Sequence, residues 1–273
     1  MIDSHQHFWK YHPVKDAWIT EDMAVIRHDF MPPDLEPLLA ENGFTGCIAV
    51  QADQSEAETL FLAGLASEYP FIKGVVGWID LRHPLLTGRL DYFSTIPCIK
   101  GWRHIVQAEH AGFMLDPDFL KGIAALSAKN FTYDILIRHE QLPEAMALVE
   151  RFPAQAFVID HAAKPDIKGK EIKNWAKHMA LIARHSQVYC KLSGLLTEAD
   201  WQQWNKHELF TYMDVLFEHF GPERILFGSD WPVLLLAGGY TQWVAMVQEY
   251  LEPLGTAVQQ QVFQDNAVKF YNL

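Results

Sequence analysis

The sequence is poor in cysteine: its 273 residues include three, Cys47, Cys98 and Cys190, which lie far apart and each within an apolar run. An odd, widely spaced set excludes a disulfide framework, and it lacks the close pairs of a zinc knuckle. Cysteines in such surroundings are typically reduced and packed in a core. We therefore expect the protein in a reducing cytoplasm.

Positive charge is also scarce, with 22 Lys and Arg against 34 Asp and Glu, a formal net charge of -12, and basic residues that are dispersed. This balance argues against nucleic acid and anionic membrane surfaces as partners. No apolar run approaches the ~18 residues of a membrane helix, and the first residues lack the basic and apolar segments of an export signal. We expect a soluble, unexported protein, and these features leave its oligomeric state open.

Hydrophobic residues make up 49% of the chain and charged residues 21%, a globular composition with enough length for a sizeable core. No linker or composition break divides the sequence, so we expect one domain spanning residues 1–273. Eight strand-like segments, mostly apolar on both faces, alternate with helical stretches: 1–9, 45–52, 72–80, 98–104, 132–138, 156–161, 187–193 and 224–230.

Strands that are apolar on both faces and separated by helices are typical of a parallel sheet covered by helices. Eight such units predict an α/β fold, a closed (β/α)8 TIM-like barrel, with a doubly wound sheet as the alternative. Residues 8–33 show no sustained period and predict a lid or binding loop. Helices are expected over 34–42, 55–69, 84–93, from 117 after an Asp116 N-cap, 142–152 and 256–271.

The first strand carries the sharpest local motif, a histidine pair two residues apart. His5 and His7 project to the same side of a strand, whereas Ser4 and Gln6 face the other way. Two converging imidazoles serve as a metal clamp or as paired donors and proton carriers against a substrate. The alternative is that one histidine packs in the core and the other is solvated.

Other polar residues follow apolar strands at the same end, where a barrel has its active site. They are Arg103 and His104 after the fourth strand, Arg138 and His139 after the fifth, His161 after the sixth and Asp230 after the eighth. Randomly placed surface groups would not all fall at one end of the strands. We therefore predict that they form a functional site with His5 and His7.

Asp230 shares a strand face with Leu226 and Gly228, and the glycine leaves room for the carboxylate to reach the barrel axis. There it can bind a metal, orient a water or take its proton; the alternative is a helix N-cap. His161 follows Phe157 on one face, as a metal ligand or a donor to a substrate carbonyl, or else as a core histidine bonded to a neighbour.

Arg103 can hold a carbonyl or a developing oxyanion through charge-assisted hydrogen bonds. Because His104 adjoins Arg103 on a strand, the two side chains should point in opposite directions unless the chain turns there. Only one of them is therefore expected to point inward. Arg138 and His139 predict either a salt bridge at the rim or a substrate contact. Tryptophans near the strand ends either pack against sugar carbons or belong to the core: Trp9, Trp78, Trp102 and Trp231.

Seven segments together resemble the amidohydrolase superfamily, and more closely its sugar-lactonase branch of the L-fuconolactonase and L-rhamnonolactonase type. They are IDSHQHFW (2–9), DFMPPDL (29–35), KGWRHIVQAE (100–109), VIDHAAKP (158–165), YCKLSGL (189–195), GPERILFGSDWP (221–232) and NAVKFY (266–271). The resemblance implies a distorted (β/α)8 barrel that hydrolyses a lactone. It makes His5 and His7 the strand-one pair, His161 the strand-six histidine and Asp230 the strand-eight acid or base.

The same resemblance bears on metal. Binuclear members need a bridging Lys or Glu from strand four, where this chain has Arg103 and His104, and Arg138 adjoins His139 where metal-dependent relatives have a plain histidine ligand. A cation beside arginine is disfavoured, so a two-metal site is not expected. One Zn²⁺ on His5, His7 and Asp230, or no metal at all, are the two alternatives.

The expected reaction is hydrolysis of a sugar aldonolactone, a small-molecule substrate, to the open-chain acid. Asp230 would deprotonate water while Arg103 and a histidine, or one metal, polarise the carbonyl. A second hypothesis is dicarboxylate lactone hydrolysis or decarboxylation, which would need several basic residues in the pocket. A third is an inert barrel that binds sugars, which the intact His5, His7, His161 and Asp230 argue against.

Overall fold

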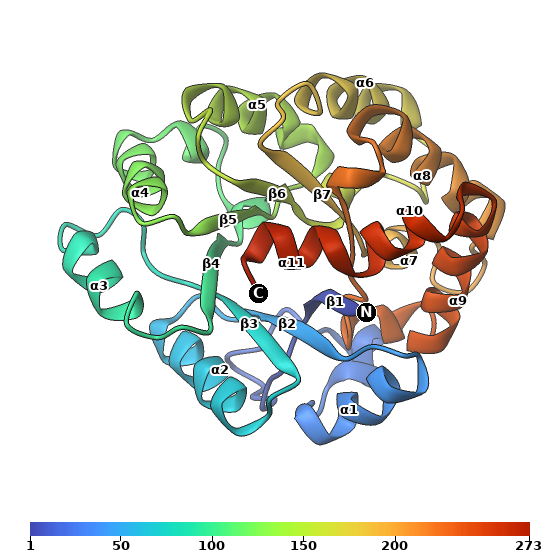
Figure 1. Ribbon diagram of the computed structural model, residues 1–273, viewed down its shortest axis with the longest axis horizontal. Coiled ribbons are helices and arrows are strands. Elements are labelled where there is room, and N and C mark those ends of the chain that lie inside the picture. The colour runs from blue at the N-terminus through green and yellow to red at the C-terminus, as the bar shows by residue number, and fades with distance from the viewer.

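The computed structural model describes all residues 1–273 and shows eight parallel strands surrounded by helices (Figure 1). Neighbouring strands pair in sequence order, so the fold is the (β/α)8 barrel and not the doubly wound sheet. The strands are β1 (Ile2–Gln6), β2 (Gly46–Val50), β3 (Ile72–Gly77), β4 (Ile99–His104), β5 (Thr132–Ile135), β6 (Phe157–Ile159), β7 (Val188–Leu192) and β8 (Ile225–Phe227).

Several strands end earlier than the sequence predicts, because the chain leaves the sheet before the polar residues begin. β5 ends at Ile135, β6 at Ile159 and β8 at Phe227, each two or three residues short of the predicted end. The polar residues predicted at the ends of these three strands therefore lie on the connections that follow them, whereas His5, Arg103 and His104 lie within β1 and β4. That is the position in which a barrel carries its functional groups.

The barrel closes between β1 and β8 through a short seam. The Asp230 amide donates to the His5 carbonyl at 2.8 Å, and the His7 amide donates to the Trp231 carbonyl at 2.7 Å. Lower on the seam, the Asp3 carboxylate accepts from the Ser229 amide at 2.9 Å in place of a backbone carbonyl. The seam thus brings the first and last strands of the chain side by side.

The helices surround the sheet, and their starts follow local chemistry. The Ser55 side chain caps its helix by accepting from the Glu58 amide, and Asp116 caps the helix predicted from residue 117, as expected. The first helix begins at Pro32, two residues earlier than predicted, because proline suits a first turn. The helices are α1 (Pro32–Glu41), α2 (Glu56–Glu68), α3 (Leu86–Phe93), α4 (Pro117–Ala128), α5 (Leu142–Arg151), α6 (Ile172–Ile182), α7 (Leu195–Glu198), α8 (Lys206–Phe220), α9 (Tyr240–Leu251), α10 (Thr256–Gln260) and α11 (Asn266–Tyr271).

Two apolar clusters stabilise this arrangement. The larger, of 68 buried residues, lies mainly between the strands and the surrounding helices. The smaller, of 10 buried residues, fills the inside of the barrel, where Ile48, Val158 and Leu226 meet Phe270 and Tyr271 of α11. Helix α11 crosses the barrel at the end where the strands begin and closes it (Figure 1).

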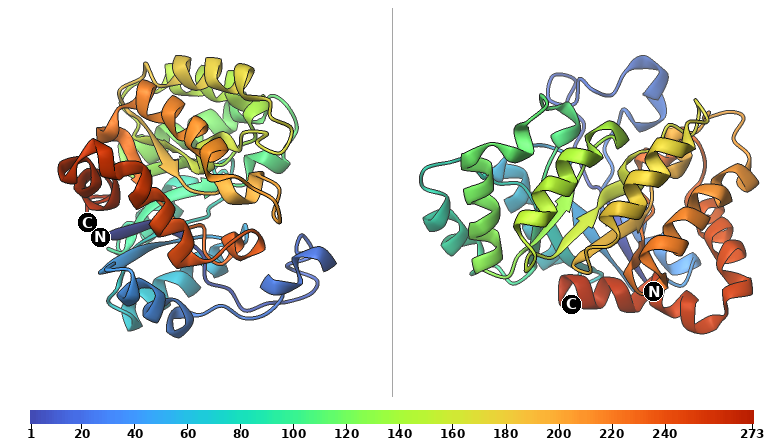
Figure 2. Two further views of the ribbon diagram at one scale, coloured as in Figure 1. Left: turned by 90° about the vertical axis from the view of Figure 1, so that its right-hand side faces the viewer. Right: turned by 90° about the horizontal axis from the view of Figure 1, so that it is seen from above.

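The opposite end is framed by the long loop that follows β1 (Figure 2). Within it Trp9 and Phe30 exchange two backbone hydrogen bonds, of 3.0 and 2.9 Å, and Glu21–Ile26 form a short 3-10 helix. The Trp9 indole donates to the His28 carbonyl at 2.9 Å. These bonds fold the loop back on itself above the carboxyl ends of the strands.

The three cysteines are unpaired, as predicted; Cys47 and Cys190 are buried, whereas Cys98 is half-buried. None of the helices combines the length and apolar character needed to cross a bilayer.

Candidate active site

A pocket of about 360 Å³ opens at the carboxyl ends of the strands. Five of the predicted site residues meet in its wall, together with polar residues that the sequence analysis did not single out. Its lining consists of His7, Trp9, Trp18, Ala52, Gln54, Arg103, Ile105, Gln107, Ala108, Leu136, His161, Lys164, Asp230 and Val233.

The histidine pair converges as its spacing predicts. The Nε2 atoms of His5 and His7 lie 3.2 Å apart, and the carboxylate of Asp230 lies 3.8 and 3.4 Å from them, respectively. His7 Nδ1 lies 2.8 Å from the Val50 carbonyl, which has no proton, so Nδ1 carries the hydrogen. A Cβ on Gly228 would come within 2.7 Å of His5 Cβ, so this glycine gives His5 its space.

His161 reaches the same point from a left-handed turn. Its φ is +51°, and the three residues that follow it, through Lys164, also have positive φ. Non-glycine residues seldom adopt this conformation, and such strain persists where the surroundings enforce it. Gly194 packs against the ring, where a Cβ would come within 2.7 Å, and Ser193 Oγ lies 2.9 Å from Nδ1. The free Nε2 then faces Asp230 at 3.8 Å.

Arg103 is the inward-pointing member of its pair. Its Nη1 donates to Asp160 at 3.0 Å and its Nε donates to the Gln51 side chain at 3.0 Å. The same Nη1 lies 3.3 Å from His5 Nε2. Its Nη2 donates to the backbone carbonyl and the side chain of Gln51, so all five N–H groups already face partners and Arg103 acts on a ligand in the pocket as a fixed positive charge.

His104 faces away from the pocket, as expected for the neighbour of an inward residue on a strand. The Trp78 indole donates to its Nδ1 at 3.1 Å, and its Nε2 lies 2.8 Å from the Glu109 carboxylate. The ring also stacks on Phe113 at 4.7 Å. His104 and Trp78, both predicted to bind substrate, therefore have their partners outside the pocket lining.

The other predicted substrate-binding residues divide between rim, core and pocket. Arg138 is exposed, and His139 lies 3.0 Å from the Lys164 carbonyl and 3.5 Å from Glu140, so both belong to the rim. Trp231 is buried against Phe30. Trp9 does line the pocket.

Trp18 joins Trp9 in the pocket wall, packing edge-on at 6.0 Å between ring centres. Its side chain is 44% exposed, so much of its face is available to a ligand. The aperiodic loop in which it lies gave no sequence signal for this position.

The pKa values of Asp230, His161 and His5 are all lowered, which leaves the carboxyl ionised and the two imidazoles neutral. Burial works to raise the pKa of Asp230, but His161, His7 and His5 outweigh it and hold the pKa well below its usual range. Burial lowers the pKa of His161 to about 4. Burial, reinforced by the nearby Lys191, also lowers the pKa of His5 well below its usual value. At neutral pH Asp230 is therefore an ionised carboxylate beside the neutral imidazoles of His5 and His161, the form in which it can accept a proton.

A buried ionic layer lies beneath the site, and the sequence analysis missed it. The Lys191 ammonium contacts Asp134 at 2.5 Å, Asp160 at 3.0 Å and His5 Nδ1 at 3.0 Å, all fully buried. Burial raises the pKa of Asp134 to about 6 although Lys191 opposes it, whereas for Asp160 Lys191 and His5 outweigh burial and lower the pKa. Single charged residues within apolar strand segments were the available signal.

The donor set fits one divalent ion by position. Tetrahedral zinc with bonds of about 2.1 Å separates its ligands by about 3.4 Å, and His5, His7 and Asp230 lie 3.2 to 3.8 Å apart. His5, His161 and Asp230 form another such group, with ligand atoms within 4.8 Å of one another. Arg103, 3.3 Å from His5 Nε2, adds a fixed positive charge beside either set.

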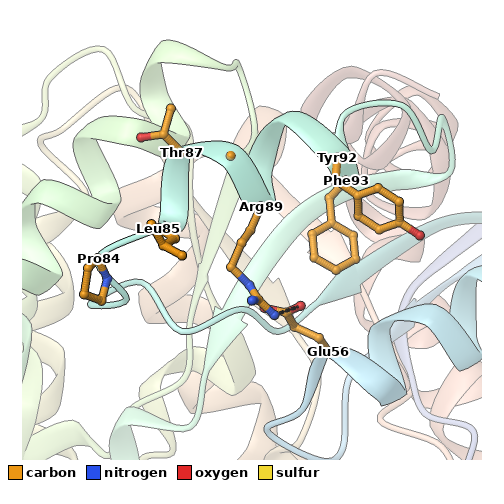
Figure 3. A pocket seen from close by; sticks show the side chains of 8 residues that line it. Glu56, Pro84, Leu85, Thr87, Arg89, Tyr92 and Phe93 are labelled. Atoms are coloured by element: carbon orange, nitrogen blue, oxygen red, sulfur yellow. Dashed lines mark hydrogen bonds and ion pairs between the residues drawn. The ribbon is translucent and has the colours of Figure 1, made fainter.

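A larger hollow, of about 660 Å³, lies on the surface between α2 and α3 (Figure 3). Arg89 and Glu56 form an ion pair across its floor, and Leu85 and Tyr92 line its exposed side. None of the convergent imidazoles or carboxylates reaches it. Size alone therefore does not identify the active site in this molecule.

Comparison with known proteins agrees with this geometry. A family model described as Amidohydrolase matches residues 2–273. An L-fucono-1,5-lactonase from Burkholderia multivorans is 37% identical over 284 residues, covering 100% of this chain and 96% of the relative. One from Burkholderia ambifaria is 35% identical, covering 100% of this chain and 95% of that protein.

Among solved structures, an amidohydrolase from Burkholderia multivorans with bound zinc superposes with a TM-score of 0.97 at 37% identity. The likeness covers 100% of this chain and 99% of the other. The likeness in sequence and in fold therefore extends over the whole chain. The chain belongs to the amidohydrolase family.

Proposed function

We propose that this protein hydrolyses a neutral sugar aldonolactone to its open-chain acid. The observation that carries the proposal is an ionised Asp230 carboxylate among neutral imidazoles, in the wall of a pocket that also presents Arg103. The full-length likeness to L-fucono-1,5-lactonases supports the substrate class. An inert sugar-binding barrel has no need of a carboxylate with a lowered pKa.

In the proposed reaction, Asp230 takes a proton from water as the water oxygen bonds to the lactone carbonyl carbon. Arg103 and His161 stabilise the negative charge that develops on the carbonyl oxygen. The ring C–O bond then breaks, and the proton held by Asp230 passes to the departing ring oxygen. The products are a hydroxyl group and a carboxylic acid, which ionises at neutral pH.

A single divalent ion fits His5, His7 and Asp230, and when bound it would act as a Lewis acid on the carbonyl or lower the pKa of water. We infer that the chain binds at most one such ion, because the cationic Arg103 stands beside His5. Elemental analysis of purified protein should find no more than one ion per chain. Two tightly bound ions would contradict this inference.

Charge pairing in the pocket favours a neutral substrate over a dicarboxylate. Arg103 pairs with Asp160 at 3.0 Å, and Lys164 pairs with Glu198 at 3.6 Å. The further arginine that could bind a carboxylate, Arg138, lies outside the pocket lining. Each cation of the pocket therefore already has its own carboxylate, and no excess positive charge is left for an acidic ligand.

A panel of sugar lactones with one dicarboxylate lactone, followed by acid release, tests the proposal. We expect hydrolysis of neutral six-carbon lactones, and similar rates for L-fuconolactone and D-arabinonolactone, which match at the ring hydroxyls. Each inverted hydroxyl should lower kcat/KM by roughly one to two decades, because an unpaired buried polar group costs about 1 to 3 kcal/mol. Turnover of the dicarboxylate alone would overturn the assignment.

We also infer that residues 1–273 fold as one unit in a reducing cytoplasm. One sheet that joins the first and last strands supports the single unit, and three unpaired thiols support the compartment. One cooperative unfolding transition, unchanged by a reductant, is the expected result. Two separate transitions would contradict the single unit.

A further inference from the structure

The side chain of Lys191 lies in the barrel interior, directly beneath the histidine pair. It comes from β7 and is fully buried. An ammonium group has three N–H donors and no acceptor. Three acceptors surround it, Asp134 at 2.5 Å, Asp160 at 3.0 Å and His5 Nδ1 at 3.0 Å. Lys191 therefore has hydrogen-bond partners in Asp134 and His5, and Asp160 Oδ1 is its ion-pair partner.

This contact determines where His5 carries its hydrogen. A ring nitrogen accepts a hydrogen bond only through its lone pair, so Nδ1 is unprotonated and the hydrogen is on Nε2. His7 provides an independent check. Its Nδ1 donates to the Val50 carbonyl, which leaves its Nε2 as an acceptor, 3.2 Å from His5 Nε2. The His5 hydrogen thus meets a lone pair on His7.

The opposite tautomer of His5 satisfies weaker contacts and creates two conflicts. It would gain Asp160 Oδ1, which has no other hydrogen bond, at 3.3 Å and Arg103 Nη1 at 3.3 Å as partners, whereas a hydrogen on Nε2 faces the N–H groups of Arg103. It would also set an N–H group against the Lys191 ammonium at 3.0 Å and oppose two lone pairs across the 3.2 Å between His5 and His7. The shorter contacts favour the hydrogen on Nε2.

We propose that Lys191 is a positioning residue that fixes His5 and His7 in opposite tautomers, joined by an N–H···N hydrogen bond. Lys191 is then the buried cation that organises the histidine pair when no metal is bound. A metal that used both Nε2 atoms would have to break this bond and shift the His5 hydrogen to Nδ1. The role in hydrolysis rests on the proposed function, whereas the tautomers do not.

Nitrogen-15 NMR of histidine-labelled wild-type protein in the presence of a chelator tests the tautomers directly. Signals of His5 and His7 are assigned by their loss in H5N and H7N. We expect a hydrogen on Nε2 of His5 and on Nδ1 of His7. Hydrogens on Nδ1 of both rings would overturn the proposal, and this measurement needs neither substrate nor a Lys191 variant.

A charge-balanced variant, Lys191→Met with Asp134→Asn, removes one cation and one anion together. His5 should shift its hydrogen to Nδ1 and donate to Asp160, and zinc affinity measured by calorimetry should rise at least tenfold. Asp134→Asn alone retains Lys191 and should keep the wild-type tautomers and affinity. Wild-type tautomers in the folded double variant would also contradict the proposal.

Activity separates this inference from the proposed function. If chelated wild-type protein shows the expected tautomers but hydrolyses none of the lactones, the proposed function fails and the role of Lys191 in the histidine pair stands. If lactones are hydrolysed while both rings carry hydrogen on Nδ1, the positioning role fails and the function stands.

Discussion

The inside of the barrel has two layers of opposite character. Near α11 it is apolar, with Val158 and Leu226 packed on the helix; near the pocket it is ionic, with Asp160, Lys191 and Arg103 paired. Positions two apart in the same strand segments supply both layers, as Val158 and Asp160 do, or Tyr189 and Lys191. The apolar layer gains stability from burial, whereas buried ion pairs add little net stability and are costly to break. Substitutions should therefore separate folding from activity according to layer.

The largest effect is expected at the ionic end, from Asp230→Asn. Asparagine keeps the shape of the side chain but cannot take a proton from water, so kcat should fall by roughly 10²- to 10⁴-fold. Unfolding free energy should change little by comparison, as measured by denaturant titration of the same sample. Near-wild-type turnover in the folded variant would remove Asp230 from the proposed reaction.

Leu226→Ala at the apolar end should show the reverse pattern. Loss of a fully buried leucine in a packed layer costs about 2 to 5 kcal/mol of unfolding free energy, while kcat stays within a few-fold of wild type below the unfolding transition. Leu226→Met, which conserves volume, is the matched control and should cost less than about 1.5 kcal/mol. Equal losses of activity in the two folded variants would erase the distinction between the layers.

Acid should weaken the fold through His161. Its pKa is lowered by burial from the usual 6.5 to about 4, so the folded state resists protonation that the unfolded state accepts. The stabilisation is complete above pH 6.5 and is lost as pH falls through about 4. At about 1.4 kcal/mol per pH unit the loss is on the order of 3 kcal/mol. In His161→Gln, the unfolding free energy measured with a chelator should depend less steeply on pH over this range. A pH dependence as steep as that of the wild-type protein would contradict the assignment.

The smallest effect tests the contact between the layers. The Tyr271 hydroxyl donates to Asp134 at 2.8 Å, joining α11 to the ionic layer. Tyr271→Phe should cost about 0.5 to 1.5 kcal/mol of unfolding free energy with little change in kcat. Tyr189→Phe, in the same apolar cluster but without a hydrogen bond from its hydroxyl to the protein, is the control. Equal costs for both would show that the contact contributes nothing.

The apolar layer and the strands were predictable because alternation and composition are local properties. The sequence placed His5 and His7 on one side of β1, and the structure brings their Nε2 atoms within 3.2 Å. The sequence left open which of Arg103 and His104 points inward, because alternation along a strand does not show which of its faces lies inside the barrel. Gln51 and Asp160, which follow β2 and β6 and hold Arg103 inward, come close to it only after folding.

The ionic layer was missed for the same reason. Lys191 and Asp134 lie 57 positions apart, and each looks like an isolated charge in an apolar segment until the barrel brings them together. The left-handed turn at His161 also has no local signal, because alanine and lysine seldom adopt positive φ. Its conformation is held by tertiary packing against Gly194.

The seam between β1 and β8 has a consequence for how the protein is made. His5 leaves the ribosome long before Asp230, yet the bond from the Asp230 amide to the His5 carbonyl joins them. Contacts of such sequence separation form slowly, because a long loop must close first. A nascent chain that has not yet emerged through Asp230 has a histidine pair without its carboxylate. The proposed catalytic group is therefore completed only after residue 230 has emerged, and hydrolysis during translation would time the closure of the barrel.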